Sequence, residues 1–130
     1  MKPVLLALTV ALAALGSTTA FAASAPAQKA KLIHMVSFKF KDTATAAQIK
    51  EVEDVFRGLK AKIPQIRSLE WGTNVSPEKH DKGFTHAWVL SFKSAKDRDT
   101  YLNHPEHKKF GGALGPVLGD VFVLDFWAQR

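Results

Sequence analysis

The chain has 130 residues, no cysteine and a formal net charge of +6, and 46% of its residues are hydrophobic. That length suits one structured domain, and the lack of cysteine excludes disulfide bonds and thiol chemistry. The 18 lysine and arginine residues are scattered without a long basic run, so the composition does not favour nucleic-acid binding.

The N-terminus has the pattern of a cleavable export signal. Lys2 precedes an apolar run over residues 4–15, and an A-x-A cleavage site ends at Ala22. The apolar run is too short to cross the roughly 30 Å hydrocarbon core of a bilayer, so we expect no stable membrane anchor. We therefore expect cleavage after Ala22 and a mature protein that is periplasmic or secreted.

The mature chain is expected to begin with a short leader and to continue as one domain. Residues 23–30 are rich in Ala, Ser, Pro, Gln and Lys, which predicts a flexible leader, and residues 31–130 remain for the domain. A single domain of this size buries only about two-thirds of its surface, so its stability is marginal. Because no disulfide can add stability, we expect oligomerisation to supply the extra burial.

The domain is expected to open with a strand followed by a helix. Apolar and polar residues alternate over Leu32–Phe40, which predicts a strand, and His34 lies within its apolar row. Thr45 begins a capping box, and Phe56 belongs to the apolar stripe of the helix that follows. Pro64 ends this helix because proline lacks an amide hydrogen and restricts the residue before it.

Two more strands are expected in the middle of the chain. The second spans Ile66–Val75 and is interrupted by Gly72, and the third spans Phe84–Phe92 after a polar loop. His86 and Trp88 share one apolar row of the third strand, while smaller and mostly apolar side chains fill its other row. Strands that are apolar on both faces need cover on both. We expect helices on one face and a partner subunit on the other.

The last third of the domain predicts a helix, a turn and a final strand. The helix spans Ala95–Asn103, and a short helical turn over Pro105–Phe110 is broken by the Gly111-Gly112 pair. Residues 113–118 allow one further helical turn, and Val121–Trp127 is the last strand. The order β-α-β-β-α-β predicts an α+β, ferredoxin-like fold with helices on one side of an antiparallel sheet.

Five short segments carry a combined pattern, in which the Tyr-x-x-His-Pro-x-His run and the Gly-x-Thr-His strand are the most specific parts. The segments are Leu32–Lys41, Ile63-Pro64, Leu69–Gly72, Gly83–Ala87 and Tyr101–His107. Over about residues 31–127, the chain resembles the stress-responsive α/β-barrel (Dabb) domain family, which includes plant stress proteins and olivetolic acid cyclase. The resemblance implies a homodimer whose two sheets join into an α/β-barrel.

The resemblance also implies site residues. In the cyclase, the tyrosine and the last histidine of the Tyr-x-x-His-Pro-x-His run are the catalytic pair, and they match Tyr101 and His107 here. Histidines of the first and third strands line the cyclase pocket. The first helix lacks the more aromatic wall of the cyclase, so we expect a pocket of different shape and no polyketide cyclisation. The expected ligand-binding residues are His34, Val52, Phe56, His86 and Trp88.

The chemistry of these residues leaves two interpretations open. His107 titrates near neutrality and can accept a proton, while the hydroxyl of Tyr101 can hold an oxyanion, which together suit enolisation beside a carbonyl. In the other interpretation, Tyr101 packs against the sheet and His107 orders the turn. Likewise, His34 and His86 either form the polar end of a pocket or are structural, bonded to the backbone or to Asp125.

The function expected first is a homodimer that binds a small, mostly apolar or weakly acidic molecule between sheet and helices. The alternatives are a cofactor-independent lyase, isomerase or cyclase that uses the tyrosine and histidine, and a monooxygenase-like dimeric barrel. His104 and His107 have a spacing that metal sites use, but no carboxylate or thiol in the motif completes a site. We expect no metal and no cofactor.

Overall fold

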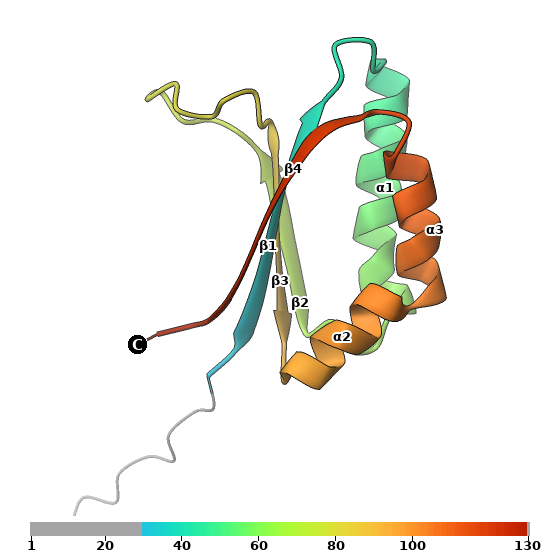
Figure 1. The fold of residues 1–130 in the computed structure, drawn as a ribbon, viewed down its shortest axis with the longest axis vertical. Coiled ribbons are helices and arrows are strands. Elements are labelled where there is room, and N and C mark those ends of the chain that lie inside the picture. Colours follow the sequence, from blue (N-terminus) through green and yellow to red (C-terminus); the bar gives the residue numbers. More distant parts are fainter. Residues whose placement is uncertain (1–29, 130) are drawn as a thin grey trace, which may run out of the picture.

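A computed structural model describes residues 30–129 (Figure 1). The expected export signal, residues 1–22, and residues 23–29 of the expected leader lie outside the described residues. Within the described range, no helix is long and apolar enough to cross a membrane. The elements are β1 (Leu32–Phe40), α1 (Ala46–Lys62), β2 (Ser68–Thr73), β3 (His86–Phe92), α2 (Ala95–Asn103), α3 (Pro105–Leu114) and β4 (Leu118–Trp127).

The strands form one four-stranded antiparallel sheet in the order β2-β3-β1-β4. All three helices lie on the same face of this sheet (Figure 1). The fold is therefore α+β and ferredoxin-like, which confirms the class predicted from the order of the elements. The central strand β1 pairs with β3 on one side and with β4 on the other, so the inward row of its side chains, which includes His34, lies at the middle of the helix-covered face.

Helix α1 begins and ends where the sequence predicts. The Thr45 hydroxyl accepts a hydrogen bond from the Gln48 amide at 3.2 Å, and the Gln48 side chain accepts one from the Thr45 amide at 2.9 Å. These bonds satisfy two amides that the first turn of a helix otherwise leaves unpaired. Val52, Phe56 and Leu59 then point into the core and are each 1% exposed. The capping box and the stop before Pro64 are both confirmed.

The main correction concerns the glycine pair after Phe110. The helical turn predicted to break there continues as α3 to Leu114. Glycine costs a helix only about 1 kcal/mol relative to alanine, and the burial of Phe110 and Leu114 on one face of α3 offsets that cost. The helical turn suggested for residues 113–118 does not form separately, because β4 already begins at Leu118.

The strand boundaries also differ from the predictions. β2 covers only Ser68–Thr73 and continues through Gly72, where an added Cβ meets no atom within 4 Å. β3 begins at His86 rather than at Phe84, and just before it the Thr85 amide donates a hydrogen bond to the Phe38 carbonyl of β1. Shifts of two or three residues at element ends leave the alternation of the strands, and so their faces, unchanged.

Aromatic side chains fill the core between the sheet and α1. Trp88 is fully buried, and its ring centroid lies 4.1 Å from that of Phe56 and 4.7 Å from that of Trp71. Phe38 and Phe110 stack at 6.1 Å on the side toward α3. Aromatic burial of this kind stabilises the fold strongly. It also fixes the distance between the sheet and the helices next to the candidate site.

Candidate functional site

A cavity of about 310 Å³ lies between the β1–β4 part of the sheet and the three helices. Most of its wall is apolar, and four polar side chains lie in the remainder: His34, Tyr101, His107 and Asp125. The apolar residues that line it are Val36, Phe38, Phe56, Leu102, Phe110, Gly111, Leu114, Val121 and Val123. An apolar chamber with a few polar groups is the usual form of a small-molecule site.

Tyr101 reaches this cavity from α2 and is fully buried. Its hydroxyl has no hydrogen-bond partner within residues 30–129. Burial raises the pKa of this phenol, and the negative charge of Asp125 raises it further. The hydroxyl is therefore neutral at physiological pH and has a proton to donate. A buried hydroxyl that is left unpaired is costly, and at the cavity wall it is placed to donate a hydrogen bond into the cavity.

His107 lies in the first two turns of α3, and its ring centroid is 4.5 Å from that of Tyr101. Its Nδ1 atom lies 3.1 Å from the Leu102 carbonyl oxygen. A carbonyl can only accept, so Nδ1 carries the proton and Nε2 carries the lone pair of the neutral ring. Burial lowers the pKa of His107 against the opposing effect of that hydrogen bond, and the nearby His34 lowers it further. The ring is thus a neutral base at physiological pH.

The turn between α2 and α3 brings Tyr101 and His107 together. His104 ends α2 and caps α3, and its Nδ1 accepts a hydrogen bond from the Glu106 amide at 3.2 Å. Pro105 occupies the first position of α3, where its missing amide hydrogen costs nothing. This cap explains the spacing of the two histidines in the motif. Within residues 30–129, no three His, Cys, Asp or Glu side chains gather as a metal site.

Asp125 links the cavity to α2 through a chain of charged hydrogen bonds. Its Oδ1 atom lies 2.5 Å from Nδ1 of His34, and its Oδ2 atom accepts a hydrogen bond from Arg98. Burial opposes ionisation of Asp125, but the bonds from His34 and Arg98 outweigh it and lower its pKa. Because the carboxylate accepts, Nδ1 of His34 donates, and the ring orientation is set. The His34 ring lies 5.7 Å from that of Tyr101.

His86 lies elsewhere, with both ring nitrogens in hydrogen bonds. Its Nε2 atom is 2.9 Å from Glu53 and its Nδ1 atom is 2.8 Å from the Thr85 hydroxyl. On the sheet, His86 is paired with Phe38, four residues along β1 from His34. At about 3.3 Å per residue, that register separates the two histidines by about 13 Å along the strands. The alternation of the strands shows a shared face but cannot show this separation.

The structure thus brings His34, Phe56, Tyr101 and His107 to one cavity and leaves the other expected site residues outside its wall. Trp88 and Val52 are buried in the core beside it. The lining residues that sequence analysis missed lie on β1, α2, α3 and β4, and those on α3 were missed because that helix was expected to break at the glycine pair. The spacing of four between Phe110 and Leu114 is the signal that favours its continuation.

This arrangement supplies one hydrogen-bond donor and one base at the end of an apolar chamber. The Tyr101 hydroxyl can donate to an oxygen atom of a bound molecule, and Nε2 of His107 can accept a proton. An oxygen that becomes more negative is stabilised by such a donor, and a neighbouring C–H or O–H is a substrate for such a base. Binding of a weak acid and proton transfer beside a carbonyl both use these two groups.

The chain is similar to known proteins over the whole domain. The profile of the family described as Stress responsive A/B Barrel Domain (Dabb) matches residues 32–128. Olivetolic acid cyclase from Cannabis sativa is 29% identical over 97 residues, which cover 75% of this chain and 96% of the cyclase. A stress-response A/B barrel domain-containing protein from Arabidopsis thaliana is 32% identical over 99 residues, which cover 72% of this chain and 82% of that protein.

Solved structures share the fold. A crystal structure of an Arabidopsis thaliana protein is 27% identical with a TM-score of 0.71, and the match covers 76% of this chain and 96% of that one. A dimeric protein with a ferredoxin-like fold from Bacteroides fragilis is 27% identical with a TM-score of 0.63, covering 75% and 96%. Hydroxynitrile lyase from Passiflora edulis, 24% identical, has a TM-score of 0.74 over 79% of this chain and 97% of the lyase.

Proposed function

The chain belongs to the stress-responsive A/B barrel domain family, and we propose that it binds a small, mostly apolar or weakly acidic molecule in the cavity beside Tyr101 and His107. The observation that carries this proposal is the Tyr101 hydroxyl, which is buried at the cavity wall without a partner in the described chain. A ligand oxygen that accepts its proton offsets the cost of burying it.

The shape and lining of the cavity define the class of ligand. Its volume of about 310 Å³ lies at the small end of the range for ligand pockets. Val36, Phe56 and Leu114 offer apolar contacts to the body of a ligand, whereas Tyr101 and His107 lie together at a polar part of the wall. A molecule with a short alkyl or aromatic body and one phenol, carboxylic acid or carbonyl group matches both parts.

Two adjacent glycines of α3 offer a matched test. Gly111 lines the cavity and Gly112 does not, and a Cβ added at either position meets no atom within 4 Å. Leucine at either position favours the helix by about the same amount, so stability should not separate Gly111→Leu from Gly112→Leu. Only Gly111→Leu puts a new side chain beside the cavity.

Isothermal titration calorimetry with 4-butylphenol and with octanoic acid measures how each leucine substitution changes the affinity of the cavity for a ligand. We expect the wild type and Gly112→Leu to bind with affinities within about threefold, and Gly111→Leu to bind at least about tenfold more weakly, which is about 1.4 kcal/mol. The proposal is wrong if the wild type binds neither probe, or if both variants lose affinity equally.

We also propose that the protein acts as a homodimer joined through the free face of the sheet. On that face, Phe122, Leu124 and Phe126 of β4 are 46–48% exposed, and the register places Met35 and Ile33 of β1 beside them. An exposed apolar row of this kind marks an interaction surface. A second copy is the occupant that the relatives favour, since the Bacteroides fragilis structure is dimeric. The large apolar cover also suits a small domain without disulfides.

We propose further that the mature protein is exported, to the periplasm or beyond the cell. The support is the pattern of residues 1–22, in which a lysine, an apolar run and an A-x-A site follow in order. Intact mass measurement of the protein isolated from the cells that make it tests this proposal. We expect the mass of a chain that starts at Ala23. The mass of a chain that still includes the first 22 residues would contradict export with cleavage.

Proton transfer is the second candidate function, and the observation that favours it is the tautomer of His107. Its Nδ1 atom donates a hydrogen bond to the Leu102 carbonyl, so Nε2 is the basic atom of the ring. The ring centroids of His107 and Tyr101 lie 4.5 Å apart. Among the relatives, olivetolic acid cyclase is an enzyme. Here the histidine would remove a proton beside a carbonyl while the tyrosine donates to the oxygen of the enolate.

Exchange of the methyl protons of acetophenone in D₂O, followed by NMR, tests this second function without knowledge of the natural substrate. We expect the wild type to accelerate exchange and His107→Ala to return it to the rate in buffer, with the melting temperature nearly unchanged. A wild type that does not accelerate exchange would leave binding as the function. A large loss of stability in His107→Ala would assign the ring a structural role.

A further inference from the structure

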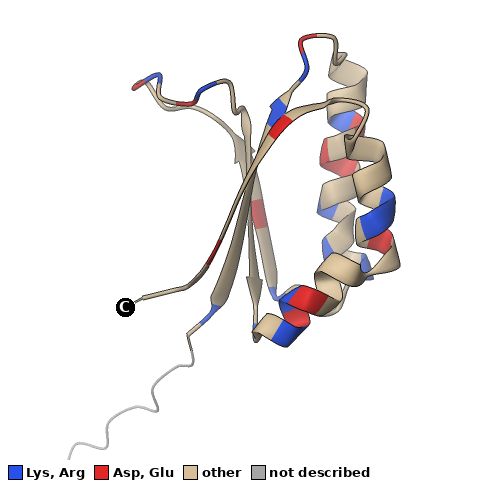
Figure 2. Cartoon of the chain, in the orientation of Figure 1, with Lys and Arg blue, Asp and Glu red and all other residues tan. Residues whose placement is uncertain are grey.

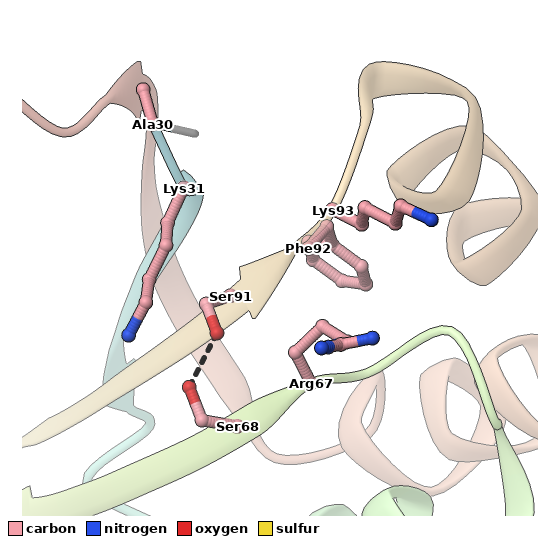
Figure 3. Close-up of a pocket in the computed structure, with 7 residues that line it drawn as sticks. All are labelled: Ala30, Lys31, Arg67, Ser68, Ser91, Phe92 and Lys93. Atoms are coloured by element: carbon pink, nitrogen blue, oxygen red, sulfur yellow. Dashed lines mark hydrogen bonds between the residues drawn. The ribbon is translucent and has the colours of Figure 1, made fainter. Parts of the chain in front are cut away.

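A second cavity, of about 540 Å³, lies at the end of the sheet where β1 begins and β3 ends, and none of its lining residues belongs to the first cavity. Figure 3 shows its residues from three different segments of the chain. Three of them are cationic, two are serines, and no Asp or Glu lines it. The lining residues are Ala30, Lys31, Arg67, Ser68, Ser91, Phe92 and Lys93.

Strand pairing holds the cations at this end of the sheet. The Arg67 amide donates to the Ser91 carbonyl at 2.9 Å, and Lys31 accepts a backbone bond from Ala128 at 2.9 Å. Lys93 follows directly after β3. Figure 2 shows several Lys and Arg positions at the end of the sheet near α2. Within residues 30–129, none of the ion pairs involves these three side chains.

The two serines supply a hydroxyl that can donate to a ligand. Ser68 and Ser91 face each other across β2 and β3 with their Oγ atoms 2.5 Å apart, and Ser91 is 3% exposed. Two hydroxyls have two protons, and the bond between them uses one. Neither hydroxyl makes another hydrogen bond among the described residues. One proton of the pair is thus available at the wall of the cavity.

None of the acids near this end of the sheet lines the cavity. Figure 2 shows acidic residues on the adjacent helix α2, and of these Asp99 is paired with Arg98. Glu70, two residues along β2 from Ser68, is not part of the lining. Three like charges around one concave surface repel each other and attract counter-ions, so the site is electrostatically prepared for an anion.

We propose that this cationic cavity binds the phosphate group of a small phosphorylated molecule. Figure 3 shows Lys31 on one side of the Ser68–Ser91 pair and Arg67 on the other. A tetrahedral anion presents oxygens in several directions, so it suits donors that line one cavity without lying in one plane. A carboxylate offers its two oxygens in one plane. Arginine also matches phosphate with two parallel hydrogen bonds.

This site differs from the first cavity in chemistry and goes beyond the function proposed for it. The first cavity is apolar with a neutral donor and base, whereas the second is cationic. Ser68 and Ser91 lie on the free face of the sheet, because they alternate with the core residues Leu69 and Leu90. The phosphate site therefore lies at the rim of the proposed dimer interface, and its test must follow the oligomeric state as well.

Titration calorimetry of the full mature chain with inorganic phosphate, at low ionic strength, tests the proposal. The site variant is K31Q/R67Q/K93Q, and the matched control R57Q/K60Q/K108Q removes the same charge from exposed helix positions. We expect the control to bind phosphate within about threefold of the wild type and the site variant to bind at least about tenfold more weakly. Circular dichroism and sedimentation velocity on the same samples verify the fold and the oligomeric state.

A second variant keeps the test valid if K31Q/R67Q/K93Q does not fold. S68A/S91A leaves every charge in place and removes both hydroxyls, and with them the one proton available to a ligand, so a loss of phosphate affinity of about three- to tenfold is expected from one hydrogen bond. Equal losses in the site variant and the matched control, or no phosphate binding by the wild type, would overturn the proposal. Neither result depends on whether the first cavity binds 4-butylphenol.

Two further probes identify the source of the phosphate group. Glycerol 3-phosphate represents a soluble phosphorylated molecule, and phosphatidylcholine vesicles that contain phosphatidic acid represent a lipid headgroup. If the wild type binds glycerol 3-phosphate, and K31Q/R67Q/K93Q loses as much affinity for it as for inorganic phosphate, the ligand is a soluble phosphorylated molecule. If the wild-type protein sediments with the vesicles, K31Q/R67Q/K93Q does not, and glycerol 3-phosphate does not bind, the lipid headgroup is the source of the phosphate group. Failure with both probes would overturn the assignment to a phosphate ester.

Discussion

Replacing Tyr101 with phenylalanine should separate stability from binding. The substitution removes one buried hydroxyl that has no partner within residues 30–129 and leaves the fully buried ring in place. An unpaired buried hydroxyl costs about 1–3 kcal/mol, whereas a hydroxyl in a structural hydrogen bond contributes about 1 kcal/mol. The free energy of unfolding of Tyr101→Phe should therefore stay the same or rise by about 1–2 kcal/mol.

Urea unfolding followed by tryptophan fluorescence measures this change, and a thermal melt checks its sign. For a domain of about 100 residues, 1 kcal/mol shifts the melting temperature by about 4–8 °C. In parallel, the affinity for 4-butylphenol should fall by about three- to tenfold, because the ligand loses its hydrogen-bond donor. A loss of more than about 1 kcal/mol in stability with unchanged affinity would refute the reasoning and give the hydroxyl a structural role.

The other predictions concern titration, the Asp125 bridge and the dimer. Burial lowers the pKa of His107 from 6.5 in the folded protein, so the unfolded chain binds a proton at this ring at higher pH than the folded chain does. The free energy of unfolding should therefore decrease as pH falls below about 6.5. Histidine NMR titration should show His107 ionising below that pH. Asp125→Asn should destabilise the fold by about 1–2 kcal/mol by chemical denaturation, since it breaks charged bonds to His34 and Arg98. Asp54→Asn, at an exposed pair with Lys50, should leave the stability nearly unchanged, and equal losses in the two variants would contradict the importance of the Asp125 bridge. Leu124→Glu should give a monomer in sedimentation velocity, and an unchanged dimer would place the interface elsewhere.

The sequence predicted the fold well because the decisive signals are local. The alternation of Leu32–Phe40 identifies β1 residue for residue, and Ser94 caps α2 as its side-chain oxygen allows. Local signals also brought Tyr101 and His107 together, since Pro105 begins a new helix directly after α2. These features depend on neighbours within a few residues in the chain.

Features that depend on long-range pairing were not predictable in the same way. His34 and His86 share a face of the sheet, but only the register of β1 on β3 shows that they lie in different places. The continuation of α3 past Gly112 depends on burial of Leu114 against the rest of the domain, which local propensity does not contain. The cationic cavity joins three segments that adjacency in the sequence does not connect.

A crystal structure of the protein soaked with 4-butylphenol tests the central proposal most directly. We predict the phenol oxygen within hydrogen-bond distance of the Tyr101 hydroxyl, and the butyl chain among Val36, Phe56 and Leu114. That result would show that the buried hydroxyl is there to hold a ligand. Density for the probe only outside this cavity, or a cavity that stays empty while the probe binds in solution, would contradict the account.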